Sequence, residues 1–179
     1  TSGAITVAAP AVAGTNTLTL PASTGTLATT ADITGPIFVM TNSGSNQSVS
    51  NGVKTKVTLD TAVVDTNSAI DTANSKIVIP SGMGGIYSIN YALRMDGNAS
   101  SQLGIAIAYL ELNGSEYNRV YENQNSNLGR AFHCTRTTVL SLNEGDELEL
   151  YGQASTSGGT QFFNYGITYT ELSGHKIAT

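Results

Sequence analysis

Hydrophobic and polar residues alternate along most of this chain, beginning at Phe38. A period of two places successive side chains on opposite faces of an extended strand, so the pattern predicts β-strands. The segment 104–112 is apolar on both faces, which is typical of a central strand. We therefore expect an antiparallel sandwich with strands over 53–59, 77–79, 87–95, 104–112, 139–142, 147–153 and 162–172.

Two of these segments show a single apolar face most clearly. In the first, the apolar face consists of Tyr87, Ile89, Tyr91, Leu93 and Met95. In the last strand, the residues expected on one side are Phe163, Tyr165, Ile167 and Tyr169. One face of each strand should therefore pack against the other sheet.

The connections between the expected strands are of two kinds. Those at 80–85, 113–115 and 143–145 are tight and rich in glycine, whereas those at 96–104, 123–133 and 154–161 are long and polar. The two kinds alternate along the chain, so in an antiparallel arrangement all long loops gather at one end. The C-terminus should lie at the other end. Because binding residues concentrate on loops held by a rigid scaffold, we expect function at the long-loop end; the alternative is that these loops are merely solvated.

The segment 5–35 differs from the rest, since it contains one charged residue, Asp32, and its alternations are too short to build a core.

Only 12% of the 179 residues are charged, and the net charge is −5. The few basic residues are scattered, and no apolar run approaches a membrane span, so we expect neither nucleic-acid binding nor membrane insertion. The absence of an initiator Met suggests a processed protein or a fragment. The single cysteine, Cys134, excludes an internal disulfide.

Residues that could catalyse a reaction or bind metal form no recognised pattern. His133 and Cys134 are adjacent on a strand and point to opposite faces, so they make a poor nucleophile–base pair. The acidic residues within 60–71 are spaced too loosely for a calcium loop, and those within 144–147 occupy a tight turn. We expect no enzymatic activity, no cofactor and no metal, although the sequence leaves calcium open. Cys134 is interpreted as a small buried hydrophobe.

Four segments follow one another in the order of a known superfamily: "IVIPSGMGGIYSINYALRM", "AIAYLELNGSEYNRV", "TTVLSLNEGDELELYGQAS" and "FFNYGITYTEL". They resemble the C1q and tumour necrosis factor (TNF) jelly-roll superfamily over residues 37–173. In that pattern a strand ends at proline, here Pro80, and a Gly-x-Tyr opens the next strand at Gly85. The resemblance implies an all-β, two-sheet antiparallel jelly roll that forms homotrimers, with both termini at the base. It also implies that inner-sheet aromatics meet across the threefold axis, for which we assign Tyr91, Tyr165 and Tyr169; a place in the protomer's own core is the alternative.

The opening segment "ITVAAPAVAGTNTLTLPASTGTL" resembles the repeat-like stretches that precede the tip domains of bacteriophage tail fibres. There, segments from three chains stack around one axis. One such segment cannot bury enough apolar area to offset its ordering, whereas three can bury the expected contact residues Ile5, Val7, Leu18, Leu20 and Leu27. We predict a trimeric stem over 1–35, a jelly-roll head over 36–174 and a C-terminal tail over 175–179. A Thr/Ala linker is the alternative for the stem.

The sequence favours the distal part of a bacteriophage tail fibre or another virion appendage. This would be a non-enzymatic, homotrimeric adhesin that binds a host-surface glycan or protein and contacts other virion proteins through its stem. The expected receptor-binding residues are Asn98, Ser100, Gln102, Tyr121, Asn123, Asn125, Asn127, Arg130, Ser157 and Gln161. The alternatives are a capsid decoration or tail-assembly adaptor protein with a knob of this fold, and a bacterial secreted or spore-surface protein.

Overall fold

The computed structural model describes residues 35–97, 102–123 and 129–178, all within one compact unit, Thr34–Thr179. These residues form thirteen strands and no helix, in agreement with the period-two pattern. The strands are β1 (Ile37–Thr41), β2 (Gln47–Val49), β3 (Thr55–Lys56), β4 (Thr61–Asp65), β5 (Ile70–Asp71), β6 (Lys76–Val78), β7 (Gly85–Asp96), β8 (Leu103–Leu112), β9 (Ser115–Asn123), β10 (Ala131–Leu142), β11 (Glu147–Thr156), β12 (Gln161–Phe163) and β13 (Thr170–Ala178).

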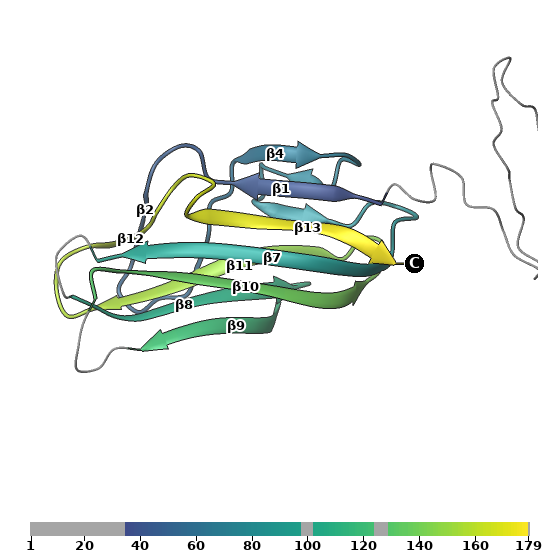
Figure 1. Cartoon of the computed structure of the whole chain (residues 1–179). Coiled ribbons are helices and arrows are strands. Elements are labelled where there is room, and N and C mark those ends of the chain that lie inside the picture. Colours follow the sequence, from purple (N-terminus) through teal and green to yellow (C-terminus); the bar gives the residue numbers. More distant parts are fainter. Residues whose placement is uncertain (1–34, 98–101, 124–128, 179) are drawn as a thin grey trace, which may run out of the picture. The chain divides into compact units, whose positions relative to one another are not determined.

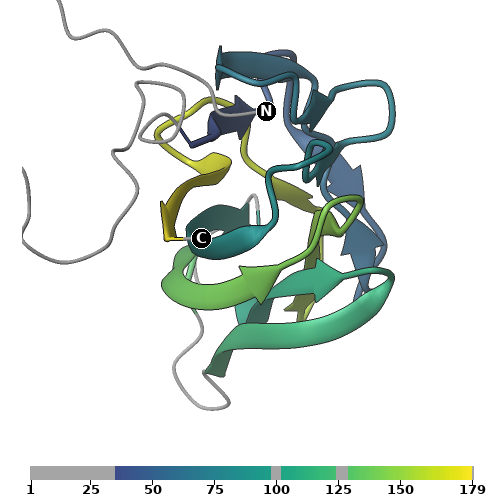
Figure 2. The ribbon, with the colours of Figure 1, turned by 90° about the vertical axis from the view of Figure 1, so that its right-hand side faces the viewer.

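Two antiparallel sheets enclose the core (Figure 1). In the β7 sheet, the strands β10, β7, β13, β1 and β4 lie side by side, and β12 and β2 extend the sheet beside the end of β7. In the β11 sheet, the order is β5, β6, β11, β8 and β9, and β3 also pairs with β11. Figure 2 views the same sandwich from the end at which the C-terminus lies. The predicted fold class, an all-β sandwich of two antiparallel sheets, is therefore confirmed.

The core lies between the sheets and is filled by the inward side chains of each strand. The predicted apolar face of 87–95 is confirmed, since Tyr87, Ile89, Tyr91, Leu93 and Met95 are all fully buried. The predicted central strand is confirmed as β8, which lies between β11 and β9. Each large apolar side chain that is buried stabilises the fold by about 1.5–3 kcal/mol, so these two strands anchor the two sheets to each other.

Two glycines make room in this core for large neighbours. A Cβ atom at Gly152 would lie 2.5 Å from Cζ of Phe163 and 2.6 Å from Cδ2 of Leu93. A Cβ atom at Gly174 would lie 2.5 Å from Cδ1 of Ile89 and 2.8 Å from Cε2 of Phe38. All four separations are far below van der Waals contact, so a residue without a side chain is required at these two positions.

The predicted last strand over 162–172 is wrong in its extent. The chain forms β12, then turns over 164–169, and then forms β13, which continues to Ala178 and so includes most of the segment predicted as a C-terminal tail. Gly166 has a φ of 95°, which favours glycine, and its N–H donates to the carbonyl of Asn42 at 2.6 Å. This turn interrupts the alternation, so Phe163 is buried whereas Tyr165 and Ile167 are exposed.

Several other elements differ from the prediction, which did not include β1, β2, β4 or β5. The segment 53–59 contains only the short strand β3, and Val53 is exposed. β10 begins at Ala131, well before the predicted start at 139, and β9 was not predicted as a strand. β9 is a sheet edge with a largely exposed, polar sequence, so it lacks the apolar face on which the period-two signal depends.

The prediction that the long loops gather at one end is confirmed by hydrogen bonds between the residues at their bases. The N–H of Gly97 donates to the carbonyl of Arg130 at 2.8 Å, and the N–H of Ser157 donates to the carbonyl of Gln102 at 2.9 Å. The tight turns lie at the opposite end, where Gly114 and Gly145 have φ values of 75° and 81°. The C-terminus is also at the tight-turn end (Figure 1).

Candidate functional site

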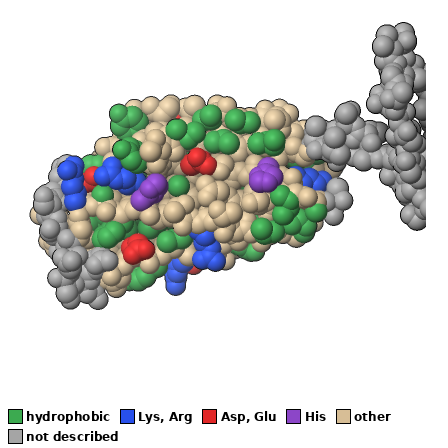
Figure 3. Space-filling view, viewed as in Figure 1, with side chains coloured by type: hydrophobic (Ala, Val, Ile, Leu, Met, Phe, Trp, Pro, Cys, Tyr) green, Lys and Arg blue, Asp and Glu red, His purple; other side chains and the backbone are tan. Residues whose placement is uncertain are grey.

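The outer face of the β7 sheet carries few charges and several exposed apolar side chains (Figure 3). Its side chains pair in rows across β1, β13, β7 and β10. One row consists of Ile37, His175, Ser88 and Val139. The next row consists of Val39, Ser173, Asn90 and Thr137. A shallow hollow lies between these rows, lined by Ile37, Val39, Ser88, Asn90, Ser173 and His175.

Exposed large hydrophobic side chains are concentrated on the β7 sheet and on the connection between β12 and β13. Among the described residues, eight of the eleven belong to the β7 sheet or to the connection between β12 and β13: Ile37, Val63, Val64, Val139, Tyr165, Ile167, Tyr169 and Ile177. The other three are Val53, Tyr117 and Tyr121. Such a concentration on one sheet and the adjoining connection is typical of an interaction surface.

The three aromatics assigned to a trimer interface lie in two different environments. Tyr165 and Tyr169 are 49% and 39% exposed, so their side chains are available to a partner. Tyr91 is fully buried and donates a hydrogen bond from its hydroxyl to Oδ1 of Asn118 at 2.8 Å, and burial raises its pKa to about 12. The assignment of Tyr91 to the interface is therefore corrected, because a side chain without exposed surface in the single chain belongs to the core. The five predicted stem residues Ile5, Val7, Leu18, Leu20 and Leu27 lie outside the described residues.

The structure places several of the predicted receptor-binding residues at the long-loop end. Gln102, Arg130 and Ser157 lie at the bases of the three loops, and Asn123 ends β9. The Nδ2 of Asn123 donates to the hydroxyl of Tyr121 at 2.9 Å, and Tyr121 is exposed. The other predicted contacts in the loops, Asn98, Ser100, Asn125 and Asn127, lie outside the described residues.

Gln161 has a structural role within the protomer. It is buried, its Nε2 donates to the carbonyl of Val49 at 2.6 Å, and its Oε1 accepts from the hydroxyl of Thr156 at 3.0 Å. Both ends of the side-chain amide are therefore engaged within the protomer. Gln161 secures the base of the 154–161 loop, and its predicted role as a receptor contact is corrected.

A charged cluster lies at the long-loop end. Of its members, only Arg130 was predicted from the sequence as a receptor-binding residue. Asp96, at the end of β7, is only 2% exposed and lies 3.5 Å from Arg94 Nη2 and 3.6 Å from Arg130 Nε. The guanidinium of Arg94 lies 4.8 Å from the centre of the Tyr169 ring, a cation–π distance. His133 on β10 is the cross-strand partner of Arg94. We call Arg94, Asp96, Arg130 and His133 the arginine cluster.

The stability of the fold should respond to pH through His133. Partial burial and, secondarily, the nearby Arg94 lower the pKa of His133 below its ordinary 6.5. The unfolded chain therefore takes up a proton at a higher pH than the folded chain, so stability is complete above pH 6.5 and decreases as the pH falls through the folded pKa. We expect wild type to lose more thermal stability than His133→Asn between neutral and mildly acidic pH. A difference in Tm between the two proteins that is constant over this range would contradict the expectation.

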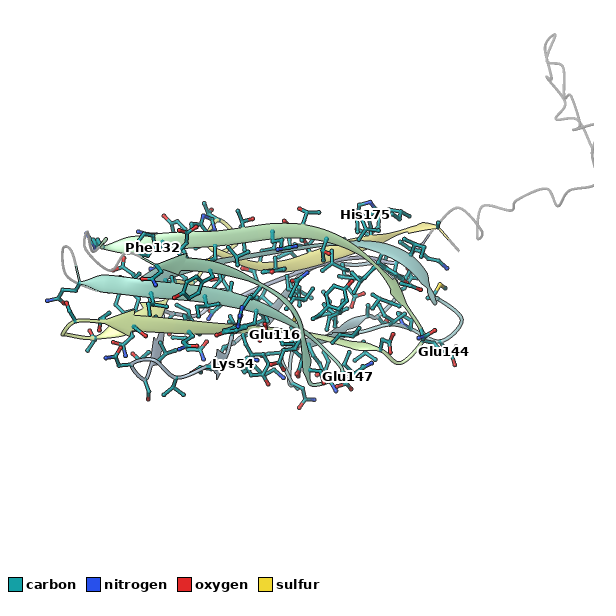
Figure 4. All side chains as sticks on the ribbon, turned by 90° about the horizontal axis from the view of Figure 1, so that it is seen from below. Lys54, Glu116, Phe132, Glu144, Glu147 and His175 are labelled. Carbon is teal, nitrogen blue, oxygen red and sulfur yellow. The ribbon has the colours of Figure 1, made fainter. Side chains whose placement is uncertain are left out.

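The outer face of the β11 sheet has a different character, with lysine and glutamate side chains matched in pairs. Lys54 pairs with Glu111, Lys56 with Glu149 and Lys76 with Glu147. The ammonium of Lys54 also lies 4.5 Å from the centre of the ring of Tyr109. Figure 4 labels Lys54 and Glu116 about midway along the length of the domain, Phe132 at the long-loop end and Glu144 at the tight-turn end.

Two of the acidic residues considered as calcium ligands, Asp65 and Asp71, instead accept hydrogen bonds from backbone N–H groups of the turns that follow them. Asp65 accepts the N–H groups of Ala69 and Ile70 at 2.8 and 3.0 Å, and Asp71 accepts the N–H of Asn74 at 3.0 Å. Within residues 35–97, 102–123 and 129–178, no group of three or more potential ligands is placed to hold a metal ion. The same residues contain no helix long and apolar enough to cross a membrane.

Cys134 is buried on β10, and its thiol approaches the carbonyl of Ala106 at 3.8 Å. Desolvation raises the pKa of this thiol to about 12, so it stays protonated at neutral pH and is a poor nucleophile. This environment agrees with the interpretation of Cys134 as a small hydrophobic core residue.

Comparison with known proteins identifies the fold. No protein-family model matches the chain, and no curated protein matches its sequence. Murine APRIL has a TM-score of 0.56 and 14% identity, covering 80% of this chain and 100% of that chain. The globular domain of zebrafish complement 1qA has a TM-score of 0.55 and 13% identity, covering 79% and 97% respectively. Eiger TNF from S. frugiperda has a TM-score of 0.51 and 12% identity, covering 80% and 94%. The described unit is therefore a C1q/TNF-like jelly roll, as its four sequence segments predicted.

Proposed function

We propose that this chain is the distal part of a bacteriophage tail fibre or a related virion appendage. In this proposal, three copies associate through the part of the outer face of the β7 sheet that holds the rows of Ile37 and Val39. They present their long loops to a host-surface receptor, which we infer to be a glycan. The observation that carries the proposal is the contrast between the two regions. One sheet face is apolar and poor in charge, and the loop-bearing end is polar.

Association through the β7 sheet follows from the physical character of its outer face. Ile37 and Val139 are examples of the exposed apolar side chains on this face. Burying them between chains would stabilise the association by roughly 25 cal/mol per Å² of apolar area removed from water. The serine, threonine and asparagine side chains between them can donate or accept hydrogen bonds, so the same face can meet copies of itself. The resemblance to C1q and TNF proteins, whose members are trimers, favours three copies over two.

The path of the chain supports the outward orientation of the long loops. The N–H of Lys176, near the end of β13, donates to the carbonyl of Pro36 at 3.1 Å. Both ends of the described unit therefore lie at the tight-turn end. A stem formed by residues 1–35 would enter there, and the three long loops would be the most distal part of the head.

Receptor binding can be tested with the labelled full chain on intact cells of the bacterial host. We expect saturable binding that weakens about tenfold in the double variant Asn125→Ala/Ser157→Ala, because each loss of a polar contact costs about 0.5–1.5 kcal/mol. The matched control is Asn143→Ala/Ser115→Ala, which makes the same chemical changes at the tight-turn end. Equal weakening by both double variants, or no saturable binding by wild type, would contradict the proposal.

The place of the protein on the virion can be tested separately by immunogold electron microscopy of purified virions. An antibody against the jelly-roll head should label the tips of tail fibres or another distal appendage. Label on the shell would overturn this assignment and would instead identify a capsid decoration protein.

A further inference from the structure

The arginine cluster combines more positive than negative charge at the end of the molecule where the long loops meet. Arg94 and Arg130 contribute two positive charges, and both face the one carboxylate of Asp96. One positive charge therefore remains uncompensated within the cluster. The lysines of the β11 sheet differ, since Lys54, Lys56 and Lys76 each have their own glutamate.

The two guanidinium groups retain capacity for a further anionic partner. Their separations from Asp96, 3.5 and 3.6 Å, are longer than the 2.7–2.9 Å that is usual for a strong charge-assisted hydrogen bond. Each guanidinium carries five N–H donors, whereas the Asp96 carboxylate has two oxygens. Donors therefore remain available for a carboxylate from outside, in the bidentate geometry that arginine favours.

The cluster is held in place from three sides. The backbone N–H of Arg94 donates to the carbonyl of Tyr169 at 2.8 Å, and the ring of Tyr169 lies beside the Arg94 guanidinium. Asp96 is buried beneath the two arginines, and the backbone of Arg130 is bonded to Gly97. The Arg130 side chain is 65% exposed, so it is accessible to a ligand. Arg94 is therefore pre-positioned and should lose little side-chain freedom on binding.

We propose that the arginine cluster binds the carboxylate of an acidic sugar in the host glycan, an inference that deepens and rests on the proposed receptor-binding function. Arg94 and Arg130 hold the carboxylate, and Asp96 positions the two guanidiniums. His133, on the strand opposite Arg94, can hydrogen-bond to a sugar hydroxyl. The single excess charge matches a carboxylate better than a phosphate monoester, which carries nearly two negative charges at neutral pH.

The test uses three sugars with the same ring that differ at C6: sodium glucuronate, glucose 6-phosphate and glucose. The full chain, labelled with ¹⁵N, is titrated at constant ionic strength while the Nε–Hε signals of its arginines are followed by NMR. We expect saturable shifts of the Arg94 and Arg130 signals with glucuronate, much weaker ones with glucose 6-phosphate and none with glucose. Equal responses to all three sugars, or a stronger response to the phosphate, would overturn the assignment of a carboxylate.

Substitutions of single arginines test which side chains bind the carboxylate. Arg130→Gln should weaken glucuronate binding at least tenfold, whereas Arg130→Lys, which keeps the charge but loses the bidentate fork, should have an intermediate affinity. The matched control is Arg119→Gln, because Arg119 is 56% exposed and faces Glu116 on β9. Glucuronate affinity that is unchanged in Arg130→Gln, or lowered equally in Arg119→Gln, would overturn the proposal.

The cell-binding assay separates failure of this inference from failure of the proposed function. If wild type and Arg130→Gln bind host cells equally well, while Asn125→Ala/Ser157→Ala does not, the loops bind a receptor and the acidic-sugar site is wrong. If wild type does not bind host cells at all, the proposed function itself is wrong. Loss of cell binding in Arg130→Gln, together with competition by free glucuronate, supports both the receptor-binding function and the acidic-sugar site.

Discussion

Replacing Val139 with aspartate is expected to convert the proposed trimer into folded monomers of 18.5 kDa. Val139 is 57% exposed in the single chain and lies in the row that contains Ile37 and Ser88, on the proposed interface. A carboxylate buried there without a partner costs several kcal/mol, and each of the three chains would bring one. Sedimentation velocity at micromolar concentration should show a single slow species, and circular dichroism should show an unchanged β spectrum.

Val53→Asp is the matched control for this experiment. Val53 is 50% exposed, so the chemical change is the same, but it lies outside the β7 sheet. We expect Val53→Asp to remain trimeric. A trimer that persists in Val139→Asp, or that dissociates equally in both variants, would place the interface elsewhere.

Replacing Gly152 with alanine is expected to destabilise the protein by about 2 kcal/mol, in the range of overpacked cores. The new methyl group would lie within 2.6 Å of both Phe163 and Leu93, in the packed space between the two sheets. Urea denaturation at a fixed chain concentration measures the effect, since the stability of a trimer depends on concentration.

Gly158→Ala controls for the general effect of losing a glycine. Among the described residues, a Cβ at Gly158 would meet only the Nε2 of Gln102, at 3.9 Å, so we expect a change within about 0.5 kcal/mol. Shortening the opposing ring in Gly152→Ala/Phe163→Leu should relieve the clash. The double variant should therefore lose less stability than the two single losses added together. Strictly additive losses would show that the overlap with Phe163 is not the cause.

The strands with one apolar face could be predicted from the sequence because that face packs into the core. The alternation over 87–95 predicted β7 and its buried side chains, and the alternation of tight and long connections predicted which loops share an end. β9 escaped prediction because it is a polar edge strand, and the alternation after Phe163 was misleading. There, the turn at Gly166 carries Tyr165 and Ile167 to the surface, which no period-two pattern reveals.

The candidate site was predicted only in part, because it depends on pairing between distant segments. Arg130 was expected in a long loop, but the register of β7 against β10 brings it to Asp96 and places Arg94 opposite His133. The burial that removes Gln161 from the receptor surface is likewise a tertiary effect. One signal in the sequence pointed to the cluster: two of the few basic residues stand at the edges of long polar loops.

Threefold association is the claim on which the proposed interface, the stem and the presentation of the loops all depend. Size-exclusion chromatography with light scattering on the full wild-type chain tests it most directly. We expect a mass of three times 18.5 kDa that does not change on dilution into the low micromolar range. A stable species of 18.5 kDa at all concentrations would show that the chain is a monomer and that the proposed interface is wrong.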